Sequence, residues 1–250
     1  LDGVDEVPTD AREEIRRQLE KLLASYRGNY FVLSTRPEAV PPRWLNELGF
    51  REARLNPMTA RDREQFIVKW HKAIAEELAK QGRNGGHLRE TAALLKEKLN
   101  DSPPIARLAT NPLLCAMICA LHNERRHILP ESQSELCEAL CQMLLHRREI
   151  ESGLALQEFA EEYRSLAYED KRAIVENIAF YMVQNGESSI GLATAERKVA
   201  DGVQRQPRHA GADPAVICRA LIERSGLLRE PRPGHVDFIH NTFKEYLASN

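Results

Sequence analysis

The spacing of the apolar residues changes near residue 57, and this change most constrains the fold. Before it, Tyr30-Phe31-Val32-Leu33 is a continuously apolar run between turn residues, as in a strand that is buried on both faces of a parallel sheet. After it, apolar residues recur about every three or four positions, as in amphipathic helices. We therefore expect an α/β segment followed by an all-α region.

The first 57 residues predict the second half of an open parallel sheet. A helix is expected over residues 9–26, and a buried strand follows at 30–33. A short helical connection at 44–48 then leads to a weaker strand at 50–55. With the end of a strand expected at the very start of the chain, the order is strand end, helix, strand, short helix, strand.

Three carboxylates, Asp2, Asp5 and Glu6, lie within the first six residues. Hard cations such as Mg²⁺ prefer oxygen ligands and usually take one or two of them from the protein. Asp2 would hold Mg²⁺ directly or through water, and Asp5 or Glu6 would orient or deprotonate an attacking water. The alternative is an acidic helix N-terminus, where such residues complement the helix dipole.

Arg36 follows the predicted strand at 30–33, within Ser34-Thr35-Arg36-Pro37. Polar residues at the carboxyl end of such a strand face the crevice in which α/β sheets bind ligands. The guanidinium of Arg36 is therefore a candidate donor to a terminal phosphate. A surface arginine without a ligand is the alternative.

The rest of the chain predicts helices. Thr59 and Asp62 resemble a capping box, and Pro112 suits the first turn of an apolar helix. Residues 235–240 alternate like a strand, and two helices followed by a two-stranded ribbon are typical of a winged-helix unit. Helices are expected at 59–81, 88–99, 105–108, 112–122, 132–145, 168–184, 195–204, 214–225 and 241–248.

Four of the five cysteines form two pairs at helical spacing, Cys115 with Cys119 and Cys137 with Cys141. A metal site that also uses His122, His127 or His146 is one interpretation. We favour core packing, because these cysteines replace residues of apolar stripes and structural zinc sites usually pair their ligands across a turn. An odd number of cysteines in helical segments indicates reduced thiols and a cytosolic protein.

Bulk properties exclude some classes of function. The 250 residues carry a net charge of −2, which is no signature of polyanion binding. No apolar run approaches the ~20 residues that cross a bilayer, and no signal peptide is visible. The chain does not begin with Met, so we expect it to be an excerpt of a longer protein.

With both ends considered together, the chain resembles the NACHT branch of the STAND P-loop NTPases, which are signalling switch ATPases. Four segments carry the resemblance in the expected order. LDGVDE at 1–6 is similar to the extended Walker B motif, and FVLSTRP at 31–37 is similar to the sensor 1 strand. ATNPLLCAMIC at 109–119 is similar to the proline motif of the helical domain, and DFIHNTFKEYLAS at 237–249 is similar to the end of the winged-helix domain.

The resemblance implies a role for each candidate residue. Asp2 would be the metal ligand, and Asp5 and Glu6 the catalytic carboxylates. Arg36 would be the sensor, and Pro112 would lie near the adenine and ribose. His240, which in isolation would be read as a partly buried structural histidine, would contact the β-phosphate of ADP. ATP or ADP and Mg²⁺ are the implied cofactors.

The resemblance also implies an architecture and a function. We expect the C-terminal part of a P-loop parallel sheet at 1–57, a helical domain at 58–152 and a winged-helix domain at 153–250. The protein would be a nucleotide-dependent switch in innate immune or antiphage defence. Its partners would be the effector and sensor domains of the same protein and further copies of the chain. No binding to a membrane is expected, and binding to nucleic acid is not favoured.

One departure is plain, because no G-x-x-x-x-G-K-S/T loop occurs in the chain. That loop cradles the phosphates, and the family places it before the Walker B motif. We therefore expect it upstream, and expect these residues not to hydrolyse ATP by themselves.

The alternative function is a non-catalytic scaffold or transcriptional regulator whose winged helix binds DNA. Such a module needs a basic recognition helix. The candidate at 215–225 offers only Arg219 and Arg224 against Glu223, so its basic patch is poor.

Overall fold

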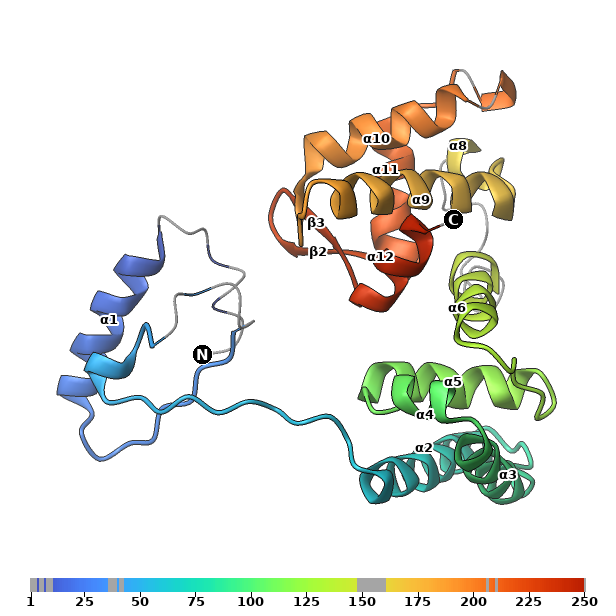
Figure 1. Ribbon diagram of the computed structural model, residues 1–250, viewed down its shortest axis with the longest axis horizontal. Helices are drawn as coiled ribbons and strands as arrows, with labels where there is room; N and C mark the ends of the chain where they lie inside the picture. Colours follow the sequence, from blue (N-terminus) through green and yellow to red (C-terminus); the bar gives the residue numbers. More distant parts are fainter. Residues whose placement is uncertain are drawn as a thin grey trace. The chain divides into compact units, whose positions relative to one another are not determined.

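The computed structural model describes residues 4, 7, 11–35, 40, 43–147, 161–205, 207–209 and 211–249. The chain divides into two compact units, Leu1–Asn56 with Pro231–Pro233 and Pro57–Glu230 with Gly234–Asn250. Figure 1 shows the elements of both and their order along the chain.

The first unit contains the helix α1 (Arg12–Ser25) and a short 3₁₀ turn, η3 (Asn46–Leu48). Leu19 is the buried residue of α1. Arg16 forms an ion pair with Glu47, and the indole N–H of Trp44 donates to Glu13 (3.3 Å), so polar contacts join the helix to the segment around η3. The predicted cap of this helix, Thr9, lies outside the described residues.

The predicted parallel sheet is wrong for the described residues among the first 57, none of which lies in a strand. Residues 30–33 and 50–55 are irregular, and Tyr30 (101%), Val32 (79%) and Leu55 (102%) are exposed. A parallel strand needs neighbouring strands to pair its N–H and C=O groups and helices to cover its faces. An apolar run supplies the side chains of such a strand but not these neighbours.

The second unit begins with helices whose predicted positions are confirmed. A capping box starts the first of them, because Asp62 N–H donates to Oγ1 of Thr59 (3.2 Å) and Thr59 N–H donates to Oδ2 of Asp62 (3.0 Å). In Figure 1, α2, α3 and α5 lie side by side. The elements are α2 (Ala60–Lys80), α3 (Leu88–Asp101), α4 (Pro103–Leu108), α5 (Pro112–Glu124), α6 (Gln133–Gln142) and a π-helical turn, η4 (Met143–Arg147).

The C-terminal helices follow as α8 (Glu161–Arg164), α9 (Tyr168–Gln184), α10 (Leu192–Gln204), a 3₁₀ turn η6 (Pro207–His209), α11 (Pro214–Arg224) and α12 (Asn241–Ala248). Helix α9 packs against α10 and α12, and α12 also packs against α6. Helix α10 begins after Gly191, three residues earlier than its predicted start at Ala195. Buried side chains from α2 to α12, among them Ile67, Leu140, Ile178 and Phe243, belong to one hydrophobic core.

A small sheet accompanies these helices. Its strands are β1 (Ile190–Gly191), β2 (Leu228–Arg232) and β3 (His235–Phe238), in the order β1-β3-β2. Strand β1 is antiparallel to β3, with Ile190 opposite Val236. Only Pro233-Gly234 joins β2 to β3, so these strands are antiparallel too, and the φ of +75° at Gly234 suits a tight hairpin.

The predicted fold class, part of a P-loop parallel sheet followed by a helical domain and a winged-helix domain, is therefore wrong. The described residues are mostly helical, with one small antiparallel sheet. The predicted boundary at residues 152/153 lies outside the described residues, so the proposed domain limits stay a prediction. None of the described helices combines the length and the apolar character that crossing a bilayer requires.

Candidate functional site

Four of the predicted site residues, Asp2, Asp5, Glu6 and Arg36, lie outside the described residues. Their roles at a metal and at phosphates stay predictions. In the part of the chain that the structure describes, no group of three or more His, Cys, Asp or Glu side chains is placed to hold a metal ion. The structure does place the other two predicted residues, Pro112 and His240.

Pro112 is the first residue of α5 and is exposed. The side chain of Asn111 caps this helix, because its Oδ1 accepts from the N–H groups of Leu113 (2.9 Å) and Leu114 (3.1 Å). Proline has no N–H, so it leaves no orphan donor in the first turn. The cap and the fixed φ of proline hold the pyrrolidine ring as a rigid apolar edge.

His240 is the N-cap of α12, where its ring is half-buried. Its Nδ1 accepts a hydrogen bond from the N–H of Thr242 (3.1 Å). Burial lowers the pKa of His240, although the nearby charge of Glu245 raises it. The neutral ring therefore carries its proton on Nε2, since Nδ1 must keep its lone pair to act as the cap. Among the described residues no hydrogen bond joins His240 to Pro112.

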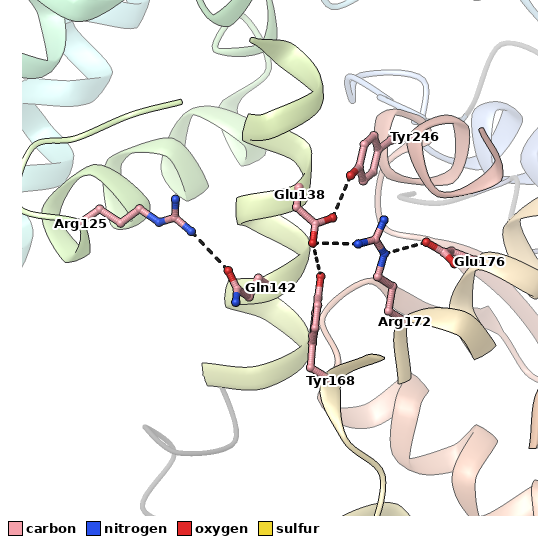
Figure 2. Close-up of polar contacts among 7 residues, drawn as sticks. All are labelled: Arg125, Glu138, Gln142, Tyr168, Arg172, Glu176 and Tyr246. Carbon is pink, nitrogen blue, oxygen red and sulfur yellow. Dashed lines mark hydrogen bonds and ion pairs between the residues drawn. The ribbon is translucent and has the colours of Figure 1, made fainter. Parts of the chain in front are cut away.

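Sequence reasoning missed a polar cluster centred on Glu138 of α6 (Figure 2). Oε1 of Glu138 accepts from the hydroxyl of Tyr168 (2.8 Å) and from Nη1 of Arg172 (3.0 Å). Its other oxygen, Oε2, accepts from the hydroxyl of Tyr246 (2.8 Å). Nε of Arg172 also donates to Glu176 (2.7 Å). We call Glu138, Tyr168, Arg172 and Tyr246 the Glu138 cluster.

The negative charge of Glu138 favours the protonated forms of its three donors. Burial, together with the hydrogen bond to Glu138 and its negative charge, raises the pKa of Tyr246 to about 12. The same causes raise the pKa of Tyr168. Burial opposes the charge of Arg172, but its hydrogen bond to Glu176 and the charge of Glu138 raise its pKa above the ordinary value. Both phenols therefore stay protonated donors, which suits a structural contact rather than acid–base catalysis.

A pocket of about 600 Å³ lies beside this cluster. Nη2 of Arg125 donates to Oε1 of Gln142 across part of its wall (3.4 Å), as Figure 2 shows. Apolar residues of the loop between α5 and α6 complete the lining. The lining residues are Arg125, Ile128, Leu129, Pro130, Ser134, Glu135, Glu138, Ala139, Gln142, Arg172 and Tyr246.

No local pattern in the sequence indicates the Glu138 cluster. The partners of Glu138 are 30, 34 and 108 positions away, on α9 and α12. A helical glutamate flanked by buried residues is usually read as part of a solvated face. Only the packing of α6 against α12, and of α12 against α9, brings the donors to it.

Three histidines gather at α2, α5 and the residues that follow α5. The ring centroids of His122 and His127 are 5.1 Å apart, and Nδ1–H of His71 donates to the carbonyl of Ile67 (2.8 Å). His122 is fully buried, and neither of its ring nitrogens has a hydrogen-bond partner in the structure. Burial, and after it the charges of His127, His71 and Lys98, lower the pKa of His122 to about 4.

All five cysteines are buried and unpaired. Core packing, which the sequence predicted for the two pairs, is confirmed for Cys115, Cys119, Cys137 and Cys141. Burial raises the pKa of Cys137 to about 11, so this thiol stays protonated near neutral pH.

The helix that would read DNA in the alternative function is α11. Its Arg219 forms an ion pair with Glu230 of β2 (2.7 Å), and the other oxygen of Glu230 accepts from the N–H of Gly234 (2.7 Å). A guanidinium that is paired in this way offers less positive charge to a phosphate backbone. No observation on α11 favours the DNA-binding alternative.

Comparison of the chain with models of protein families, with curated proteins and with solved structures finds no significant match.

Proposed function

We propose that this chain belongs to a nucleotide-dependent switch, in which ATP and ADP favour different arrangements of its helices. The similarity of four ordered segments to NACHT-type ATPases is the basis of the proposal. One structural observation carries it furthest. The Nδ1 atom of His240 accepts the N–H of Thr242 (3.1 Å), so the ring is oriented at the start of α12 with its proton on Nε2.

This arrangement suits a diphosphate. Nε2–H of His240 would donate to a β-phosphate oxygen of ADP, and the N-terminus of α12 would add the favourable end of its helix dipole. A histidine on α12 would thereby tie this helix to the nucleotide. The two nucleotide states would then differ by a few such contacts, which is enough to shift a two-state equilibrium.

Other residues would complete the nucleotide site. The exposed ring of Pro112, held by the Asn111 cap, offers an apolar edge to the purine. Asp2 as Mg²⁺ ligand, Asp5 and Glu6 at the attacking water and Arg36 as sensor enter the proposal on sequence alone. A phosphate-binding loop, which these 250 residues lack, would come from another part of the same protein.

The setting of the switch is also part of the proposal. Five buried, unpaired cysteines suit a reducing cytoplasm. Effector and sensor segments of the same protein would deliver the signal and detect the trigger, and the ATP form would assemble with further copies. Innate immune or antiphage defence is the role that the resemblance favours.

Nucleotide hydrolysis by the natural protein that contains this chain tests the proposal. Asp2→Ala and Asp5→Ala should each reduce the Mg²⁺-dependent rate at least about a hundredfold, because the metal ligand and the water-orienting carboxylate are lost. Glu20→Ala, which removes an exposed carboxylate of α1, is the control and should leave the rate unchanged. Wild-type rates in both Asp variants would refute the assignment.

A further inference from the structure

We infer that Glu138 is a latch that holds α6 against α9 and α12, and that the release of its carboxylate frees α6 from the C-terminal helices. The latch lies within the second unit. It consists of hydrogen bonds between helices that are far apart in the sequence, and it needs no nucleotide.

The acceptor and the donors of the Glu138 cluster lie on different helices. Glu138 is on α6, whereas its three donors come from the C-terminal helices, Tyr168 and Arg172 from α9 and Tyr246 from α12 (Figure 2). Both carboxylate oxygens are used. Loss of one side chain, Glu138, therefore removes three hydrogen bonds that join α6 to the two C-terminal helices.

The surroundings of Glu138 suit a contact that opens and closes. The side chains of Glu138, Arg172 and Glu176 are 34%, 26% and 25% exposed, and the pocket of about 600 Å³ lies directly beside them. Water can therefore solvate the charges when the contact opens. A fully buried ion pair would instead leave an uncompensated charge on separation, at a high cost.

Arg172 does not lose all of its partners when the latch opens. This guanidinium bonds Glu176 of its own helix as well as Glu138, so it keeps a charged partner when α6 leaves. The two tyrosine hydroxyls would turn to water. The open state thus leaves no buried unpaired charge on α9, which makes a two-state contact feasible.

The latch also links α6 to the proposed nucleotide contact, and this part rests on the proposed function. Helix α12 has His240 at its N-cap and Tyr246 six positions later. A short helix moves as a rigid body, so a ligand that fixes His240 in its present position also keeps Tyr246 at Glu138. ADP bound at His240 would then favour the closed latch.

Hydrogen–deuterium exchange of the chain tests the latch. In Glu138→Ala, amides of α6 should exchange at least about tenfold faster than in the wild type, while amides of α3 stay unchanged. Glu135→Gln is the matched control, because Glu135 is exposed on the same helix and lies outside the cluster. Unchanged α6 exchange in Glu138→Ala, equal acceleration in Glu135→Gln, or equal acceleration of α3 would each overturn the inference.

Addition of ADP to the natural protein separates this inference from the proposed function. We expect ADP to slow α6 exchange in the wild type and to lose this effect in Glu138→Ala, although both proteins bind ADP. ADP binding with equal slowing in both proteins would overturn the link through Glu138 and leave the proposed function intact. Absence of ADP binding by the wild type would overturn the proposed function, and the exchange of α6 without nucleotide would still decide the latch.

Discussion

The hydroxyl oxygen of Tyr246 lies 2.8 Å from Oε2 of Glu138, although 108 positions separate the two residues in the chain. This bond joins α12, near the end of the chain, to α6. Together with the bonds from Tyr168 and Arg172, it makes a single carboxylate the polar centre of the contact between α6 and the C-terminal helices.

Removal of one donor should measure the strength of this contact. Tyr246→Phe keeps the ring and deletes the hydroxyl, so the free energy of unfolding should fall by about 1 kcal/mol, as for a partly exposed hydrogen bond to a charged group. Chemical denaturation measures the change. Tyr30→Phe is the control, because Tyr30 is fully exposed, and should have no effect. Equal stability of Tyr246→Phe and the wild type would show that the bond contributes nothing.

The cap of α5 should contribute a similar amount. Asn111→Ala removes the oxygen that accepts from Leu113 and Leu114, and should lower the free energy of unfolding by about 1 kcal/mol. Asn111→Asp keeps an acceptor and adds a negative charge at the helix N-terminus, so it should be much less destabilising. Equal losses in both variants, measured by denaturation, would contradict the capping role.

Close packing of α10 on α9 should make Gly202→Ala destabilising. Alanine in place of glycine usually stabilises a helix by up to about 1 kcal/mol. Here the new Cβ would lie 2.9 Å from Cγ1 and 3.3 Å from Cα of Ile174. We expect a net loss of about 1–2 kcal/mol in thermal or chemical unfolding. Gly211→Ala, where no atom lies within 4 Å of the added Cβ, is the control, and a stabilised Gly202→Ala would contradict this packing.

Acid should weaken the fold through His122. Burial lowers its pKa from 6.5 to about 4 in the folded chain, so between these values the unfolded chain binds a proton that the folded chain does not. The stabilisation is complete above pH 6.5 and is lost as pH falls towards 4, by about 2–3 kcal/mol. His71, whose pKa burial also lowers, acts in the same direction.

Denaturation at several pH values checks this effect. His122→Leu should have a smaller decrease in stability between pH 6.5 and 4 than the wild type, since the proton-binding group is gone. The difference between the two curves isolates His122 from the carboxylates that titrate in the same range. Parallel curves would show that His122 does not cause the acid sensitivity.

The helices were predictable because local patterns determine them. The capping box at Thr59, the Asn111-Pro112 start of α5 and the apolar spacing of α9 and α12 specify their limits without reference to distant residues. Packing then refines these limits. Helix α10 begins at Leu192, whose N–H donates to the carbonyl of Gly234 in the hairpin (2.7 Å), a contact that no local pattern indicates.

The errors lie where distant partners decide. The run from Tyr30 to Leu33 has the composition of a buried strand, yet a strand exists only when a neighbour pairs with it. The same limit hid the Glu138 cluster, because its donors come from α9 and α12. Of the predicted site, the structure positions only Pro112 and His240, each at the start of a helix.

Calorimetry tests the central claim most directly, by comparing the ADP affinity of the natural protein with that of its His240→Asn variant. Asparagine is a good N-cap, so α12 keeps its start while the Nε2–H donor is lost. We predict a roughly 10- to 100-fold weaker affinity for ADP, as expected for one hydrogen bond to a charged oxygen. Equal ADP affinity of the two proteins would contradict the claim that His240 ties α12 to the nucleotide.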